Sequence, residues 1–159
     1  MKNRYVLPTD TPSRLFLNKV NNKLLLEDIV NPNLKKVLPS GTYQNIYITS
    51  DEEIDQQTKP CWCINTIKNT WKDDLIYYQG SMPQYHYKGF KKIILTTDTK
   101  LIEEGVQAID DEFLEWFVKN SSCEEVEVKS QHIDEFGNYI DDSFHSVTDS
   151  YLYKIIIPK

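Results

Sequence analysis

Short apolar runs separated by polar turns constrain this chain more than any other feature of its sequence. Residues 44–49 alternate polar and apolar side chains, which is typical of a strand with one buried face. Residues 91–97, 123–129 and 151–157 are further strand-like runs, whereas helical spacing is clear in only one segment. Strands followed by helices and then strands again predict an α+β fold. We expect an antiparallel or mixed β-sheet, or a small partly open barrel, packed by one or two short helices.

The order of the strands predicts two local pairings and one larger sheet. Residues 14–17 and 23–26 flank 18–22, where paired asparagines suit the positive φ of a tight turn, so a hairpin is expected there. Residues 61–65 and 74–78 are expected to pair with each other. The main sheet is predicted to contain 45–49, 91–97, 123–129 and 151–157.

Residues 110–120 carry the clearest helical pattern. Four apolar residues fall on one stripe at offsets of 0, 4, 7 and 8 from the first, and they should pack against the sheet. These residues are Ile109, Phe113, Trp116 and Phe117. Asp98 is expected to cap a shorter helix that ends at Gly105, and Ser50 with Glu53 matches the capping box of a helical turn over 50–54.

The length of 159 residues fits a single domain over 1–159, with an irregular acidic loop at about 130–150. The first residues hold only three consecutive apolar side chains before Pro8, too few for the core of a secretory signal. With three cysteines, two of them one residue apart, a disulfide framework is a poor interpretation. We therefore expect a soluble cytoplasmic protein.

Charge is distributed unevenly along the chain, whose net charge is −6. Residues 1–100 hold fourteen Lys or Arg against ten Asp or Glu, and residues 101–159 hold four against fourteen. Such an excess can simply keep a surface hydrated, or it can attract a basic partner. Our hypothesis is that the carboxylates near the two helices form an outward face that binds a basic protein partner. They are Glu103, Glu104, Asp111, Glu112 and Glu115.

Nucleic-acid binding is the alternative interpretation, because lysines and tyrosines that could contact phosphates and stack on bases occur close together. These residues are Tyr85, Tyr87, Lys88, Lys91 and Lys92. The sequence pI of about 5.1 argues against a basic footprint over the whole domain, so nucleic acid is not the expected partner.

No catalytic residues, metal site or cofactor are predicted from the sequence. Cys61 and Cys63 lack the second ligand pair of a structural zinc site, so we expect both thiols to pack on one face of a strand. His132 and His145 are placed in the acidic loop. A small enzyme with a site that the sequence does not reveal remains a further alternative.

Six blocks together resemble a family of small uncharacterised proteins from bacteriophage and environmental genomes, associated with Bacteroidetes hosts. They are LPTDTPSRL (7–15), NIYITSDEEI (45–54), KKIILTTD (91–98), GVQAIDDEFLEWFVKN (105–120), SCEEVEV (122–128) and KIIIPK (154–159). Where the family carries a Gly-Asp-Trp turn, this chain has KPCWC at 59–63, which keeps only Trp62. The family has no assigned function. The resemblance implies a phage-encoded context. Because the sequence also shows no catalytic constellation, we expect a non-enzymatic accessory protein that acts by protein–protein binding in the host cytoplasm.

Overall fold

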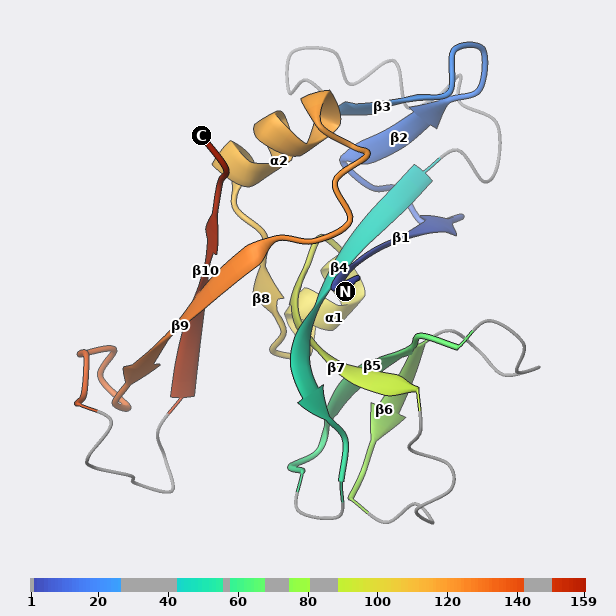
Figure 1. The fold of residues 1–159 in the computed structure, drawn as a ribbon. Coiled ribbons are helices and arrows are strands. Elements are labelled where there is room, and N and C mark those ends of the chain that lie inside the picture. Colours follow the sequence, from blue (N-terminus) through green and yellow to red (C-terminus); the bar gives the residue numbers. More distant parts are fainter. Residues whose placement is uncertain (1, 27–42, 56–57, 68–74, 81–88, 142–149) are drawn as a thin grey trace. The chain divides into compact units, whose positions relative to one another are not determined.

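The computed structural model describes residues 2–26, 43–55, 58–67, 75–80, 89–141 and 150–159. The chain divides into two compact units, Met1–Glu125 and Val126–Lys159 (Figure 1). The larger unit holds a mostly antiparallel sheet with two short helices, so the predicted α+β class is confirmed, and this sheet is not a closed barrel.

In the described part of Met1–Glu125 the sheet has eight strands. Six follow the order β3-β2-β4-β7-β5-β6, while β1 pairs with β4 and the short β8 runs parallel to β7. The strands are β1 (Arg4–Thr9), β2 (Leu15–Asn18), β3 (Lys23–Leu26), β4 (Tyr43–Glu53), β5 (Cys61–Asn65), β6 (Leu75–Tyr78), β7 (Phe90–Thr96) and β8 (Gln107–Ala108).

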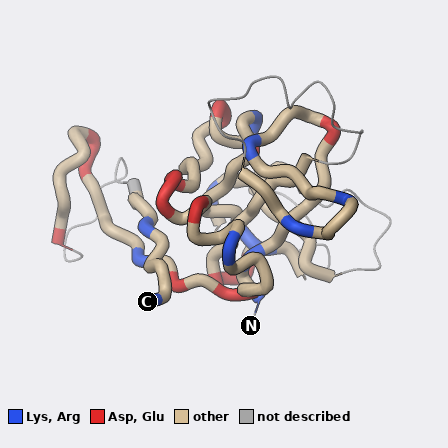
Figure 2. Tube along the Cα trace, turned by 90° about the horizontal axis from the view of Figure 1, so that it is seen from above, with Lys and Arg blue, Asp and Glu red and all other residues tan. Residues whose placement is uncertain are grey.

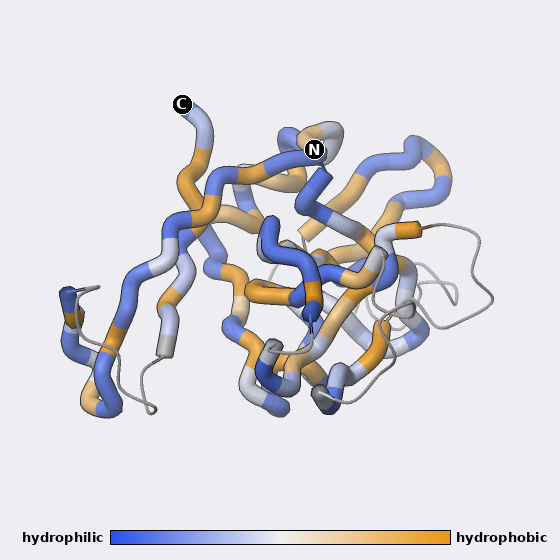
Figure 3. Tube along the Cα trace, turned by 60° about the horizontal axis from the view of Figure 1, so that its bottom comes forward, coloured by the Kyte–Doolittle hydropathy of each residue, from blue (hydrophilic) through white to orange (hydrophobic). Residues whose placement is uncertain are grey.

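Both predicted local pairings are present. The β2–β3 hairpin turns at Asn22, whose φ of 57° lies in the left-handed region that asparagine tolerates better than most residues. Strands β5 and β6 pair from Cys61↔Tyr78 to Ile64↔Leu75. Figure 3 shows hydrophobic stretches (orange) alternating with hydrophilic ones (blue) along the chain, as expected of short strands joined by polar turns.

Strand β4 is the centre of the sheet and differs from its prediction in two ways. Its first seven residues are all buried, so it is not a half-exposed strand. It also continues to Glu53, so the helical turn predicted over 50–54 is wrong. The register shifts between Thr49 and Glu53, and the Ser50 hydroxyl accepts from the Glu52 backbone N–H at 3.1 Å. The capping pattern therefore marks an irregularity within a strand, because Ser side chains make the same local bond in turns and bulges.

Two helices follow β7 and match their predictions. Helix α1 (Thr99–Glu103) is capped by Asp98, which accepts from the Lys100 N–H at 3.0 Å. Helix α2 (Asp111–Lys119) is capped by Asp110. Helix α2 lies beside β3 (Figure 1).

The unit Val126–Lys159 contains β9 (Glu127–Ile133) and β10 (Ser150–Ile156), which pair antiparallel in a two-stranded sheet of their own. The prediction that 123–129 and 151–157 belong to the main sheet is therefore wrong. An alternating pattern identifies a strand but not its partner, because partner choice depends on long-range packing.

The predicted irregular loop at 130–150 is also partly wrong. Residues 130–133 belong to β9, and a turn follows in which Asp134 accepts backbone N–H groups from Phe136 and Asn138. Gly137 takes a positive φ of 82° in this turn. Residues 142–149 lie outside the described residues.

Candidate functional site

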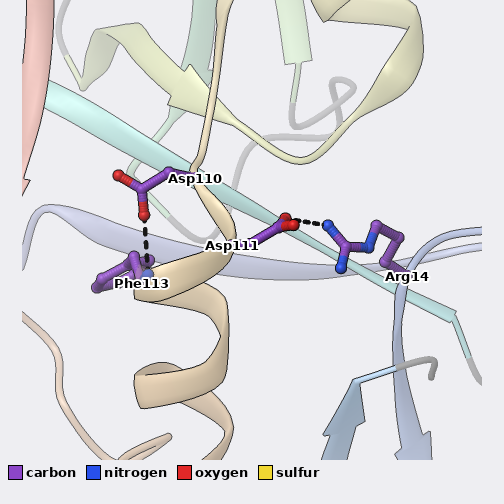
Figure 4. Close-up of polar contacts among 4 residues, drawn as sticks. All are labelled: Arg14, Asp110, Asp111 and Phe113. Atoms are coloured by element: carbon purple, nitrogen blue, oxygen red, sulfur yellow. Dashed lines mark hydrogen bonds and ion pairs between the residues drawn. The ribbon is translucent and has the colours of Figure 1, made fainter. Parts of the chain in front are cut away.

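Helix α2 begins and ends with side-chain caps that fix its position in the chain. The Asp110 carboxylate accepts from the Phe113 backbone N–H at 2.8 Å (Figure 4). At the other end, Asn120 donates its side-chain N–H to the Trp116 carbonyl at 2.8 Å. Acidic residues in the first turn and Lys119 in the last turn both oppose the helix dipole. The cap at each end satisfies helix groups that would otherwise lack partners.

One face of α2 is buried, largely as predicted. Phe113 and Phe117 are fully buried and their rings stack with centroids 5.7 Å apart. Ile109 is also buried, but Trp116 is only partly buried, and the helix buries Leu114 instead, which the predicted stripe did not include. The helix is therefore anchored through one side, which turns the opposite side outward.

The Phe117 ring also contacts a buried cation. The Arg4 guanidinium carbon lies 5.2 Å from the ring centroid, and Arg4 Nε donates to the Cys123 carbonyl at 2.7 Å. Burial lowers the pKa of Arg4, although Glu124 opposes that shift. This contact ties β1 to the segment that follows α2, both within Met1–Glu125.

The five carboxylates of the predicted acidic face divide between two helices. Asp111 forms an ion pair with Arg14, next to β2 (Figure 4). Glu112 and Glu115 are exposed, and their carboxylates make no hydrogen bond or ion pair with any residue that the structure describes. Because they are three positions apart, they share one side of α2. These two residues are the outward carboxylate pair of the helix.

Glu103 is the last residue of α1 and Glu104 is its C-cap. The Trp62 indole N–H donates to Glu104 at 2.7 Å, and the Trp62 ring meets Tyr77 edge-on with centroids 5.5 Å apart. Glu104 thus has a partner inside the unit, while Glu103 is exposed. Within Met1–Glu125, acidic positions (red) are interrupted by neutral and basic ones (Figure 2).

Of the predicted nucleic-acid residues, the structure describes only Lys91 and Lys92. Tyr85, Tyr87 and Lys88 lie outside the described residues. Lys91 and Lys92 are consecutive in β7, so their side chains point to opposite faces of the sheet. The two described lysines therefore do not share a face of β7.

The two strand cysteines share one face of β5, as predicted, and their sulfur atoms lie 3.7 Å apart. Cys63 is fully buried and Cys61 partly buried. The hydrogen bond with Cys63, and then the nearby Lys92, lower the pKa of Cys61, while burial opposes them. The same hydrogen bond and burial raise the pKa of Cys63. Lys92 lies opposite Cys63 because of the register between β5 and β7, and the sequence alone does not reveal this register.

The histidines do not form a cluster in the described part of the chain. His132 is buried in β9 and stacks on Tyr151 with centroids 5.1 Å apart, so its predicted place in an acidic loop is wrong. His86 and His145 lie outside the described residues. Among the described residues, no group of three or more His, Cys, Asp or Glu is arranged to hold a metal ion.

No family model, curated protein or solved structure matches this chain. In the described part of the chain, no helix has the length and apolar character needed to cross a membrane.

Proposed function

We propose that this chain is a non-enzymatic, phage-type accessory protein that binds a basic surface of another protein through Glu112 and Glu115. The observation that carries the proposal is the exposure of these two carboxylates on a helix that is capped at both ends and packed on its other side. Neither carboxylate has a partner among the described residues.

Three other acidic residues near the two helices have roles within the unit. Asp110 caps α2, Asp111 pairs with Arg14 and Glu104 accepts from Trp62. Surface ion pairs contribute only about 0–1 kcal/mol, so the Arg14–Asp111 pair orients the helix start more than it stabilises the fold. The face proposed for binding is accordingly narrower than the sequence predicted.

A pair of exposed carboxylates affects mainly the rate of association with a partner. Like charges held on a rigid helix attract a basic surface from a distance, and this attraction raises the association rate and weakens with salt. Because α2 is already ordered, binding would not have to order it at an entropic cost.

The test compares two charge-reversed proteins in affinity capture from a Bacteroidetes lysate. One carries Glu112→Lys and Glu115→Lys, and the other carries Asp51→Lys and Glu52→Lys, which are exposed at the far end of β4. Each pair of substitutions changes the net charge from −6 to −2, so non-specific effects of charge are the same in the two variants.

We expect wild type and the Asp51/Glu52 variant to capture the same basic protein, and the Glu112/Glu115 variant to lose it. A third variant, Glu103→Lys, shows whether the α1 carboxylate contributes. Equal capture by the Glu112/Glu115 variant, with unchanged salt dependence, refutes the proposal. Salt-sensitive retention of nucleic acid in place of protein refutes it as well.

A further inference from the structure

The two thiols of β5 are held in a geometry that suits a shared ligand better than a bond between them. The Cys61 and Cys63 sulfur atoms are 3.7 Å apart. A disulfide requires about 2.05 Å between sulfur atoms and about 3.8 Å between Cβ atoms. Residues two apart in an extended strand have parallel side chains separated by roughly 6.6 Å along the strand. Closing a disulfide here would therefore distort β5.

Two thiolates bound to one soft centre need almost no such movement. With a metal–sulfur distance of about 2.3 Å, tetrahedral bonding places the two sulfur atoms about 3.8 Å apart. With the same bond length and trigonal angles, the separation is about 4.0 Å. The observed 3.7 Å differs from these values by a few tenths of an ångström.

The surroundings fit a small anionic complex. Cys63 packs with Ile54 and Tyr78, and Phe90 and Ile76 contact the same cluster, so hard, strongly hydrated ions are disfavoured. Lys92 pairs across from Cys63, and cross-strand partners point to the same face of the sheet. Its ammonium group would offset the negative charge that two thiolates give to a monovalent cation.

We propose that Cys61 and Cys63 form a two-thiolate site for one soft, thiophilic centre, either Cu(I) or trivalent arsenic. Thiolate ligands select such centres over hard cations. The partly exposed Cys61 provides the entry side, and Cys63 completes the chelate from the interior. Because a third protein ligand is absent from the described residues, the remaining coordination positions are left to exogenous ligands.

Phenylarsine oxide is the first probe, because it requires two thiols and no electron transfer. Two As–S bonds form, two thiol protons are released, and the arsenic-bound oxygen leaves with them as one water molecule. We expect one phenylarsenic per chain by intact mass, in wild type and in Cys123→Ser. A monothiol should not remove it, and 2,3-dimercaptopropanol should.

Cys61→Ser and Cys63→Ser should each weaken binding by about a hundredfold, since one chelating bond is lost. Circular dichroism checks that both variants fold. Should Cys63→Ser fail to fold, Cys61→Ser decides the question, because Cys61 lies at the edge of the cluster. An adduct that depends on Cys123, or that survives in Cys61→Ser, overturns the proposal.

Lys92→Met separates the two chemistries without touching either sulfur. The bis-thiolate Cu(I) complex is anionic and the phenylarsenic complex is neutral, so we expect Cu(I) affinity to fall about tenfold and arsenical binding to stay unchanged. Cu(I) affinity is measured by competition with a chromophoric chelator. Rapid formation of a Cys61–Cys63 disulfide with diamide in the folded protein would contradict the geometric argument and overturn the proposal.

Discussion

Phe117 is the residue whose substitution should most disturb the packing of the buried side of α2. Its side chain is fully buried, stacks on Phe113 and lies under the Arg4 guanidinium. Emptying a buried phenylalanine site costs about 3–5 kcal/mol. Loss of a partly desolvated cation–π contact adds about 1 kcal/mol. Phe117→Ala should therefore destabilise Met1–Glu125 by about 5 kcal/mol.

Urea unfolding followed by far-UV circular dichroism measures this effect. With a slope of about 2 kcal/mol/M, the midpoint should fall by about 2.5 M. Trp116→Ala is the matched control on the same helix, because Trp116 is only partly buried and should cost about half as much. Equal losses for the two variants, or a loss below about 1 kcal/mol for Phe117→Ala, would refute the packing described for α2.

Three further predictions concern a buried hydroxyl, a helix cap and a turn. Burial, and then the hydrogen bond to Asp98, raise the pKa of Tyr47. The contribution of Tyr47 to the free energy of unfolding is therefore complete below pH 10.0 and is lost as the pH rises further. Tyr47→Phe should flatten this alkaline decline in the urea midpoint. Asp110→Ala should cost about 1 kcal/mol in the same assay, and Asp110→Asn almost nothing, because asparagine also caps helices well. Hydrogen bonds from Asn138 lower the pKa of Asp134 below 3.8. The turn should therefore persist at pH 3.8 and be lost only at lower pH. The NMR chemical shift of the Asn138 amide measures this loss.

Local signals in the sequence were sufficient for the helices and the short pairings. Asp98 and Asp110 occupy cap positions because their side chains complete nearby backbone bonds, and that chemistry depends only on neighbouring residues. The paired asparagines likewise identified the β2–β3 turn. These features need no knowledge of the rest of the chain.

Contacts between distant segments could not be predicted in the same way. The Ser50 pattern fits a helix cap and a strand irregularity equally, and only the pairing of β4 with β7 distinguishes them. The separate β9–β10 sheet depends on which strands pair, and alternation does not encode this.

The candidate site shows the same limit. The acidic residues were identifiable from composition, but their internal partners were not. Arg14 is 97 positions from Asp111 and Trp62 is 42 positions from Glu104, so no local pattern links them. Those two contacts reduce the predicted five-residue face to Glu112 and Glu115, with Glu103 apart on α1.

The association rate constant of the captured partner tests the central claim most directly. It is measured by surface plasmon resonance at low and at physiological ionic strength, for wild type and for the Glu112→Lys, Glu115→Lys protein. Outward carboxylates that steer a basic partner predict a rate about tenfold lower for the variant at low salt, with the difference shrinking as salt rises. Identical association rates for the two proteins at both ionic strengths would contradict the account.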